Sequence, residues 1–219
     1  MTLSSASVVG MMTEPFKSLT ELEQDALAEL SNIAMARAAS SLRKMVDHEV
    51  ALSVPSVEVV TQDAAVKILE RTGNPKLVAV RQDFSGLLTG RALLIFPEAR
   101  SLELVRVVVG RNLTLEDIVD LEDEALAETG NIILNSWVST IANLLNQGLK
   151  MSLPTVLRGS HQHMLEIASD KPGYVLFLHI NFEIRQVQIE GFVALLMDIP
   201  TLDEFRTLIA QYIARATRN

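Results

Sequence analysis

An internal repeat constrains the fold of this chain more than any other feature of its sequence. When the 219-residue chain is shifted by 99 positions along itself, the segment ALAE at 26–29 coincides with the segment ALAE at 125–128. Further identities at this shift, all without a gap, include Asn32 with Asn131, Ile33 with Ile132, Ser53 with Ser152, and Pro55 with Pro154. We therefore predict two repeats, at 20–112 and 113–219, that fold in the same way.

Each repeat is predicted to open with a long amphipathic helix, over 25–45 in the first and 124–145 in the second. Apolar or small residues recur at spacings of three and four from Leu27 and from Leu126. Both leucines are therefore expected in the core, with an approximate two-fold axis relating the two helices.

Strand-like runs and a closing helix follow in each repeat. The first closing helix is predicted over 98–109, and both Thr20-x-x-Glu23 and Thr201-x-x-Glu204 have the form of a capping box at a helix start. The predicted strands cover 50–60, 77–83 and 88–96, then 153–168, 174–186 and 189–198. The expected fold class is α+β: two pseudo-symmetric repeats, each a long helix followed by antiparallel strands and a closing helix, packed on a shared sheet.

The composition excludes several classes of function. The chain has 19 basic and 27 acidic residues and a formal charge of −8, so nucleic-acid binding through a basic surface is not expected. It has no cysteine, which excludes thiol catalysis, disulfide bonds and Cys-ligated zinc. Its four histidines leave little room for a histidine-based metal site.

Neither a membrane span nor a signal peptide is expected. No apolar run approaches the length of about 18 residues that crosses a bilayer, and the N-terminus lacks a positive segment followed by a long apolar one. We interpret residues 1–17 as a flexible arm before a domain at 18–219, and we expect the protein in the cytoplasm without membrane insertion.

A stripe of polar side chains lies opposite the predicted core face of the first helix. At about 100° per residue, Asp25, Glu29 and Asn32 fall within a narrow sector that points away from the core. The second helix repeats this stripe with Glu124, Glu128 and Asn131. An acidic stripe is usually only the solvated face of a helix. Asparagine, however, is a poor helix former, and its recurrence beside a glutamate in both halves favours a functional site.

A glutamate and an asparagine without a neighbouring nucleophile can support only some reactions. A carboxamide can accept and donate hydrogen bonds, so it can orient a water molecule without strongly deprotonating it. A carboxylate can act as a base, a metal ligand or an ion-pair partner. Hydrolysis of an acyl phosphate on a partner protein suits this pair, because positioning and electrostatics carry most of phosphoryl transfer.

The spacing of these residues is similar to a known signature. Asp25-x3-Glu29-x2-Asn32-x22-Pro55 resembles the motif (Asp or Ser)-x3-Glu-x2-Asn-x22-Pro of the CheC/CheX/FliY phosphatases of bacterial chemotaxis. The second copy, Glu124-x3-Glu128-x2-Asn131-x22-Pro154, departs from that motif at its first position. With two copies, the chain resembles CheC more than CheX, which has one site per subunit.

The resemblance implies a substrate, a phosphorylated CheY-like response regulator of two-component signalling. It implies that Asn32 and Asn131 enter the regulator's active site and align water behind the phosphorus, while Glu29 and Glu128 engage a regulator lysine. The regulator would supply Mg²⁺, so no cofactor or metal of the chain's own is expected. The supporting motif positions are Asp25, Glu124, Pro55 and Pro154, and the prolines are interpreted as shaping the backbone.

Two other functions remain open at this point. The chain could be a non-enzymatic adaptor that binds CheD or the regulator, or a structural component like the flagellar switch protein FliM, whose middle domain shares the implied fold without the Glu-Asn pairs. Retention of both pairs argues against the structural component. If the pairs form sites, Glu29, Asn32, Glu128 and Asn131 are expected to be exposed, whereas an asparagine that is buried and bonded within its own protein would favour a structural role.

Overall fold

A computed structural model describes residues 19–46, 48–109, 114–144, 146, 148–166, 173–184 and 187–217, so the arm predicted at 1–17 lies outside the described residues. The elements of the first half are α1 (Glu21–Val46), β1 (Val50–Thr61), α2 (Gln62–Glu70), β2 (Leu77–Gly86), β3 (Gly90–Pro97) and α3 (Glu98–Val109). Those of the second half are α4 (Leu115–Asp120), α5 (Glu122–Leu144), β4 (Leu149–Met151), β5 (Thr155–Gly159), α6 (His161–Glu166), β6 (Tyr174–Ile184), β7 (Val187–Met197) and α7 (Ile199–Ala216).

One antiparallel sheet is shared by the two halves. Its strand order is β1-β6-β7-β3-β2-β4, with β5 also paired to β2. The first strand of each half therefore pairs with the hairpin of the other half, β1 with β6 and β5 with β2. At the centre, where β3 meets β7, Leu94 pairs with Val193, the residue 99 positions later. This arrangement confirms the predicted fold class of two pseudo-symmetric repeats on a shared sheet.

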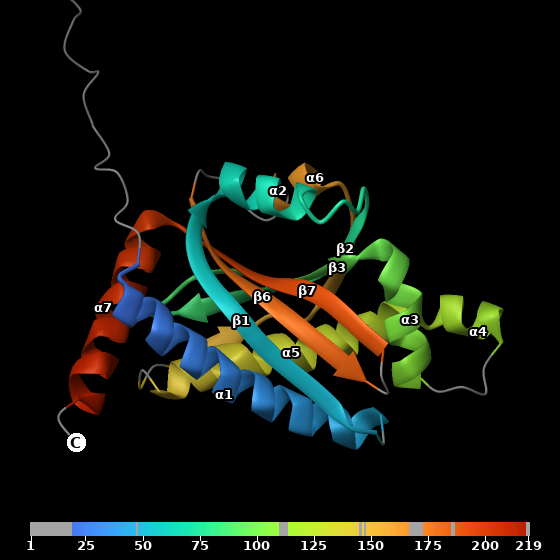
Figure 1. Ribbon diagram of the computed structural model, residues 1–219, viewed down its shortest axis with the longest axis horizontal. Helices are drawn as coiled ribbons and strands as arrows, with labels where there is room; N and C mark the ends of the chain where they lie inside the picture. Colours follow the sequence, from blue (N-terminus) through green and yellow to red (C-terminus); the bar gives the residue numbers. More distant parts are fainter. Residues whose placement is uncertain are drawn as a thin grey trace, which may run out of the picture.

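The helices cover the two faces of the sheet. Figure 1 shows α1 and α5 side by side along one face, and α2 and α6 on the opposite face. Alternating strand residues supply both cores, because successive side chains of a strand point to opposite faces: Leu94 packs with the α1 and α5 side, and Leu93 with the α2 and α6 side. Leu27 and Leu126 are buried in the α1–α5 core, as predicted.

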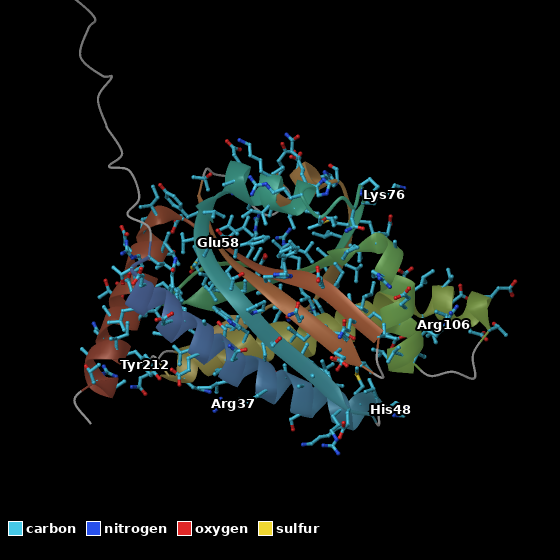
Figure 2. All side chains as sticks on the ribbon, in the orientation of Figure 1. Arg37, His48, Glu58, Lys76, Arg106 and Tyr212 are labelled. Carbon is cyan, nitrogen blue, oxygen red and sulfur yellow. The ribbon has the colours of Figure 1, made fainter. Side chains whose placement is uncertain are left out.

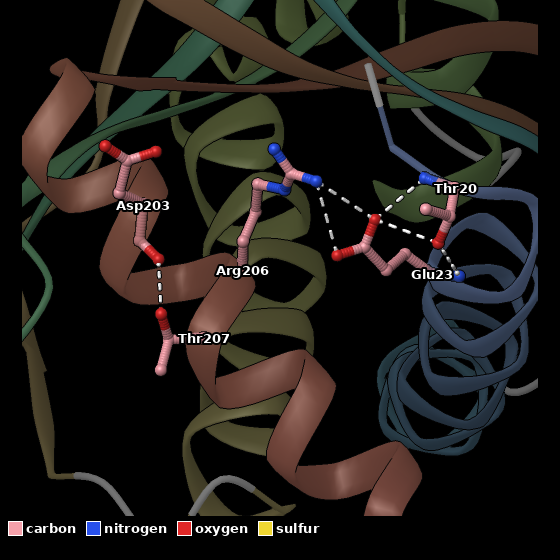
Figure 3. A network of polar contacts seen from close by, with 5 residues as sticks. All are labelled: Thr20, Glu23, Asp203, Arg206 and Thr207. Atoms are coloured by element: carbon pink, nitrogen blue, oxygen red, sulfur yellow. Dashed lines mark hydrogen bonds and ion pairs between the residues drawn. The ribbon is translucent and has the colours of Figure 1, made fainter. Parts of the chain in front are cut away.

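The start of α1 is capped as its sequence predicts. The backbone N–H of Thr20 donates to the Glu23 carboxylate over 2.7 Å, and the Glu23 backbone N–H donates back to the Thr20 hydroxyl over 3.2 Å. Arg206 from α7 also contacts this carboxylate, at 3.3 Å (Figure 3). The capping box thus joins the first helix of the chain to the last one.

The predicted start of α7 was wrong. The N-cap is Asp198, whose side chain accepts from the backbone N–H of Thr201 over 3.0 Å, so Thr201 is already inside the helix. The physical reason is that Pro200 lies in the first turn, where its missing N–H costs nothing, and the aspartate before it caps the helix.

The continuous strand predicted over 153–168 was also wrong. The structure divides this region into β5 and α6, with Pro154 before β5. Met164 and Leu165 in α6 are buried on the same side of the sheet as Ala65 and Leu69 in α2. Short apolar runs do not distinguish a strand from a buried helix, which is why both α2 and α6 were missed. Within the described ranges, no helix combines the length and the hydropathy needed to cross a membrane.

Candidate functional site

The two motif helices present their acidic side chains to solvent. Asp25 and Glu29 on α1 and Glu124 and Glu128 on α5 are all exposed. In the part of the chain that the structure describes, none of these four carboxylates has a hydrogen bond or ion pair with another residue. They are therefore available to a positively charged group of another molecule.

In the first copy of the motif, a β-bulge in β1 lies beneath Asn32. Ser53 pairs with Asn181 and Ser56 with His179, so Val54 and Pro55 together face the single residue between those partners in β6. A bulge leaves a backbone group of the longer strand without its ladder partner, and proline has no N–H to offer to the ladder. Pro55 thus coincides with the interruption of the strand pairing.

The Asn32 side chain takes up the backbone groups that this bulge leaves free. Its Oδ1 accepts from the Val54 N–H over 2.9 Å, and its Nδ2 donates to the Ala28 carbonyl over 2.9 Å and to the Val54 carbonyl over 3.4 Å. Asn32 is nevertheless exposed, as predicted. In this copy the motif spacing between asparagine and proline has a structural explanation, since the asparagine binds the residue that precedes the proline.

The second copy has the same strand irregularity, but the residue before its proline differs in exposure. The Ser152 N–H bonds to the Asp83 carbonyl and Thr155 pairs with Arg81, so Leu153 and Pro154 face Gln82. The side chain of Leu153 is 88% exposed. By contrast Val54, the equivalent residue of the first copy, is only 3% exposed. The two motif copies therefore differ in the segment that follows each asparagine's helix.

Asn131 is held by side chains rather than by a strand backbone. Its Oδ1 accepts from Gln82 Nε2 over 3.0 Å and from Asn135 Nδ2 over 2.6 Å. Gln82 is 1% exposed and also donates to the Ser152 carbonyl over 2.8 Å. Asn131 itself is half-buried, so the prediction that it is exposed was wrong. The reason is that Gln82 on β2 and Asn135, one turn along α5, close around its carboxamide.

Sequence reasoning missed Gln82 and Asn135, although each leaves a signal. Gln82 interrupts an apolar strand at a position whose alternation predicts a core residue. Asn135 follows Asn131 by four residues, so the two side chains share a helix face. Neither signal identifies a partner, because the contact between Gln82 and Asn131 depends on how β2 packs against α5.

The residue before each asparagine affects how closely its helix packs against the core. An added Cβ at Gly130 would lie 2.5 Å from the Val80 side chain, so α5 approaches β2 more closely than alanine would allow. At the equivalent place in α1, the Ser31 hydroxyl accepts from the Trp137 indole N–H over 3.0 Å. Both sites are therefore built on helices that are packed tightly against the core.

A metal centre is not indicated by the described residues. Among them, no group of three or more His, Asp or Glu side chains is arranged to hold an ion.

The polar surface of α1 continues beyond the motif to Arg37, which lies on the outer side of the molecule (Figure 2) and donates to Thr140 of α5 over 3.2 Å. The acidic motif residues thus lie on outward-facing helix surfaces.

Comparison with known proteins finds two phosphatases among the relatives of this chain. No protein-family model matches the chain. The chain is 26% identical over 144 residues to the CheY-P phosphatase CheC of Bacillus subtilis, covering 64% of this chain and 68% of CheC. It is 21% identical over 174 residues to the flagellar motor switch phosphatase FliY of Bacillus subtilis, covering 76% of this chain and 43% of FliY.

The fold is likewise similar to a solved structure. The crystal structure of Thermotoga maritima FliY superposes with a TM-score of 0.70 at 19% sequence identity, covering 89% of this chain and 98% of that one. This likeness establishes a common fold. The sequence similarity to CheC and FliY agrees with the resemblance that the Glu-Asn motif predicts.

Proposed function

Because the chain is a relative of the CheC and FliY phosphatases, we propose that it accelerates hydrolysis of the aspartyl phosphate of a CheY-like response regulator. One observation carries this proposal. A glutamate without a partner among the described residues and an asparagine three residues later recur on the outward faces of α1 and α5, at places related by the repeat. Such outward-facing side chains suit entry into the cleft of a partner protein.

The proposed reaction needs positioning more than acid–base strength. The oxygen of a water molecule attacks the phosphorus, the bond from phosphorus to the aspartate oxygen breaks, and the aspartate leaves as a carboxylate. The water's protons remain with the inorganic phosphate that is formed. A carboxamide that holds this water in line removes much of the entropic cost of the attack. Asn32 and Asn131 are the carboxamides assigned to this role.

The glutamates would bind the regulator rather than the phosphorus. Glu29 and Glu128 are exposed, so a lysine of the partner could approach each carboxylate and form a charge-assisted hydrogen bond. Mg²⁺ would be supplied by the regulator's own acidic site. Asp25 and Glu124 precede these glutamates on the same helix faces and would add negative charge at the edge of the contact.

A docking role without catalysis is the second candidate. It is favoured by one specific observation, that both asparagines are hydrogen-bonded within their own protein. An adaptor for the regulator or for CheD would use the same exposed glutamates and would need the asparagines only for stability. Kinetic measurements separate the two functions, because only a phosphatase changes the rate at which the regulator loses phosphate.

The deciding experiment follows the decay of a phosphorylated CheY-like regulator with wild-type protein, Asn32→Ala, Asn131→Ala and the double variant. Each single variant should retain one working site, and the double variant should return decay to the spontaneous rate. Asn143→Ala is a matched control, because it removes an exposed asparagine from the same helix as Asn131. A double variant that works at the wild-type rate would refute the asparagine mechanism, and a wild type that binds without acceleration would establish the adaptor.

A further inference from the structure

Three carboxamide side chains meet at the second motif copy. Gln82 on β2 and Asn135 on α5 both donate to Oδ1 of Asn131, over 3.0 and 2.6 Å. We propose that Gln82 and Asn135 are positioning residues, which hold the Asn131 carboxamide with its oxygen turned inward and its amino group turned toward the bound partner. This inference rests on the proposed function of Asn131.

Two backbone carbonyls determine this orientation. Gln82 Nε2 donates to the Ser152 carbonyl over 2.8 Å, and Asn135 Nδ2 donates to the Asn131 backbone carbonyl over 2.8 Å. Since a backbone carbonyl can only accept, both amides have to present their nitrogen at these points. Each nitrogen has a second hydrogen, and both of these hydrogens point to the Asn131 side chain. Turning the Asn131 carboxamide over would place its own N–H groups against two donors.

In this orientation, the oxygen and the nitrogen of the Asn131 carboxamide differ in their capacity to bind another molecule. Oδ1 of Asn131 has two lone pairs, and both receive a hydrogen bond. Its Nδ2 makes no hydrogen bond to any residue that the structure describes. Two N–H donors are therefore left for an oxygen of a bound molecule, either the attacking water or the phosphoryl group.

The first copy lacks both positioning side chains. By strand pairing, the place of Gln82 is taken there by Ile180, which faces the bulge in β1. The repeat places Ala36 where the second copy has Asn135. Asn32 uses its own Nδ2 for the Ala28 carbonyl over 2.9 Å. The arrangement around Asn131 is thus specific to the second site and is not a general requirement of the fold.

Gln82 is an unfavourable residue for the stability of a core position. It is 1% exposed, and its Oε1 has no hydrogen-bond partner among the described residues. A buried carbonyl without a partner is destabilising, and an apolar residue such as Ile180 of the other half avoids this penalty. Orientation of Asn131 accounts for a glutamine at this place.

The test uses two backgrounds that each leave one site intact. Asn32→Ala leaves only the second site, and Asn131→Ala leaves only the first. Adding Gln82→Leu should slow catalysis at the saturated second site by about tenfold or more, because Asn135 alone then holds the Asn131 carboxamide and its alignment is loosened, while the affinity for the regulator stays unchanged. Asn135→Ala should act in the same direction, and it is a variant that favours the helix. Neither change should affect the first site.

A loss of equal size in both backgrounds would overturn the proposal, since it would indicate general destabilisation. So would undiminished catalysis by the second site after both substitutions. If Asn32→Ala alone shows no acceleration, the proposed function of Asn131 has failed. The orientation is then decided by the ¹H–¹⁵N spectrum of the free protein. The side-chain amide signal of Asn131, assigned by its absence in Asn131→Ala, should shift in both Gln82→Leu and Asn135→Ala, and an unshifted signal would refute the orientation.

Discussion

The indole N–H of Trp137 donates a hydrogen bond to the hydroxyl of Ser31 across the interface between α5 and α1, over 3.0 Å. Both residues are buried, so the bond lies inside the core shared by the two motif helices. It is formed next to Asn32, which immediately follows Ser31 in the chain. The interface that joins the two repeats thus also supports the first candidate site.

Replacement of Ser31 by alanine is expected to lower the free energy of unfolding by about 1–3 kcal/mol, because the Trp137 N–H is left buried without an acceptor. Urea denaturation measures this change. Ser41→Ala is the control, since Ser41 is an exposed serine of the same helix. If the two variants are equally stable, the buried bond does not contribute to folding.

The two asparagine variants should differ in stability. Asn32→Ala leaves the Val54 N–H of the bulge without its acceptor, so we expect a loss of about 1–2 kcal/mol in the free energy of unfolding. Asn131→Ala leaves no donor nitrogen without any acceptor, because Gln82 Nε2 keeps the Ser152 carbonyl and Asn135 Nδ2 keeps the backbone carbonyl of residue 131. Only the second hydrogen of each amino group loses its acceptor.

The loss for Asn131→Ala should therefore be smaller, below about 1 kcal/mol. Parallel urea titrations of the two variants check this order. The reverse order would contradict the roles assigned to the Val54 and Gln82 contacts.

Substitution of Gly130 by alanine is expected to destabilise the protein. The new Cβ would lie 2.5 Å from the Val80 side chain. Overpacking of this kind costs about 1–3 kcal/mol, and the better helix propensity of alanine returns only about 1 kcal/mol. Thermal unfolding should show a lower midpoint.

Two comparisons test the cause of that change. The further substitution Val80→Ala should recover part of the loss in the Gly130→Ala protein, because it removes the two Cγ atoms that the new Cβ would meet at 2.5 and 2.7 Å, although it keeps the Val80 Cβ. Gly148→Ala should have little effect, since an added Cβ at Gly148 meets no atom within 4 Å. A midpoint that Val80→Ala only lowers further would argue against a steric origin.

The capping box at α1 predicts a dependence of stability on pH. Burial of the Glu23 carboxylate works to raise its pKa, but the hydrogen bonds from Thr20 and the contact with Arg206 outweigh burial and leave the pKa below its ordinary value. A carboxyl group with a lowered pKa in the folded state stabilises the protein above its ordinary pKa, and this stabilisation is lost as the pH falls through the lowered value.

Glu23→Gln should therefore reduce stability at neutral pH and have less effect as the pH falls through this acidic range. Urea unfolding at a series of pH values gives the comparison. Glu21→Gln serves as the control, because Glu21 is exposed and makes no hydrogen bond or ion pair with another described residue. A difference between wild type and Glu23→Gln that stays constant with pH would contradict the prediction.

Local patterns in the sequence account for the long helices and for the placement of the motif. The periodicity around Leu27 and Leu126 extends over several turns, and the exchange of bonds between Thr20 and Glu23 spans only three residues. Patterns that lie within one helix do not depend on contacts with the rest of the fold. The shorter helix α6 has too few residues to show a helical period, so its sequence predicts part of a strand instead.

The sequence alone determined that two equivalent helices would carry Asn32 and Asn131 on equivalent turns, because the 99-residue repeat and the helical period are properties of the chain itself. Only the tertiary structure decided what each asparagine binds. Asn32 meets the bulge of β1, which exists because β1 pairs with β6 of the other half. Asn131 meets Gln82, which lies 49 positions earlier in the chain. Such partners arise from long-range strand pairing and helix packing, and no local pattern encodes them.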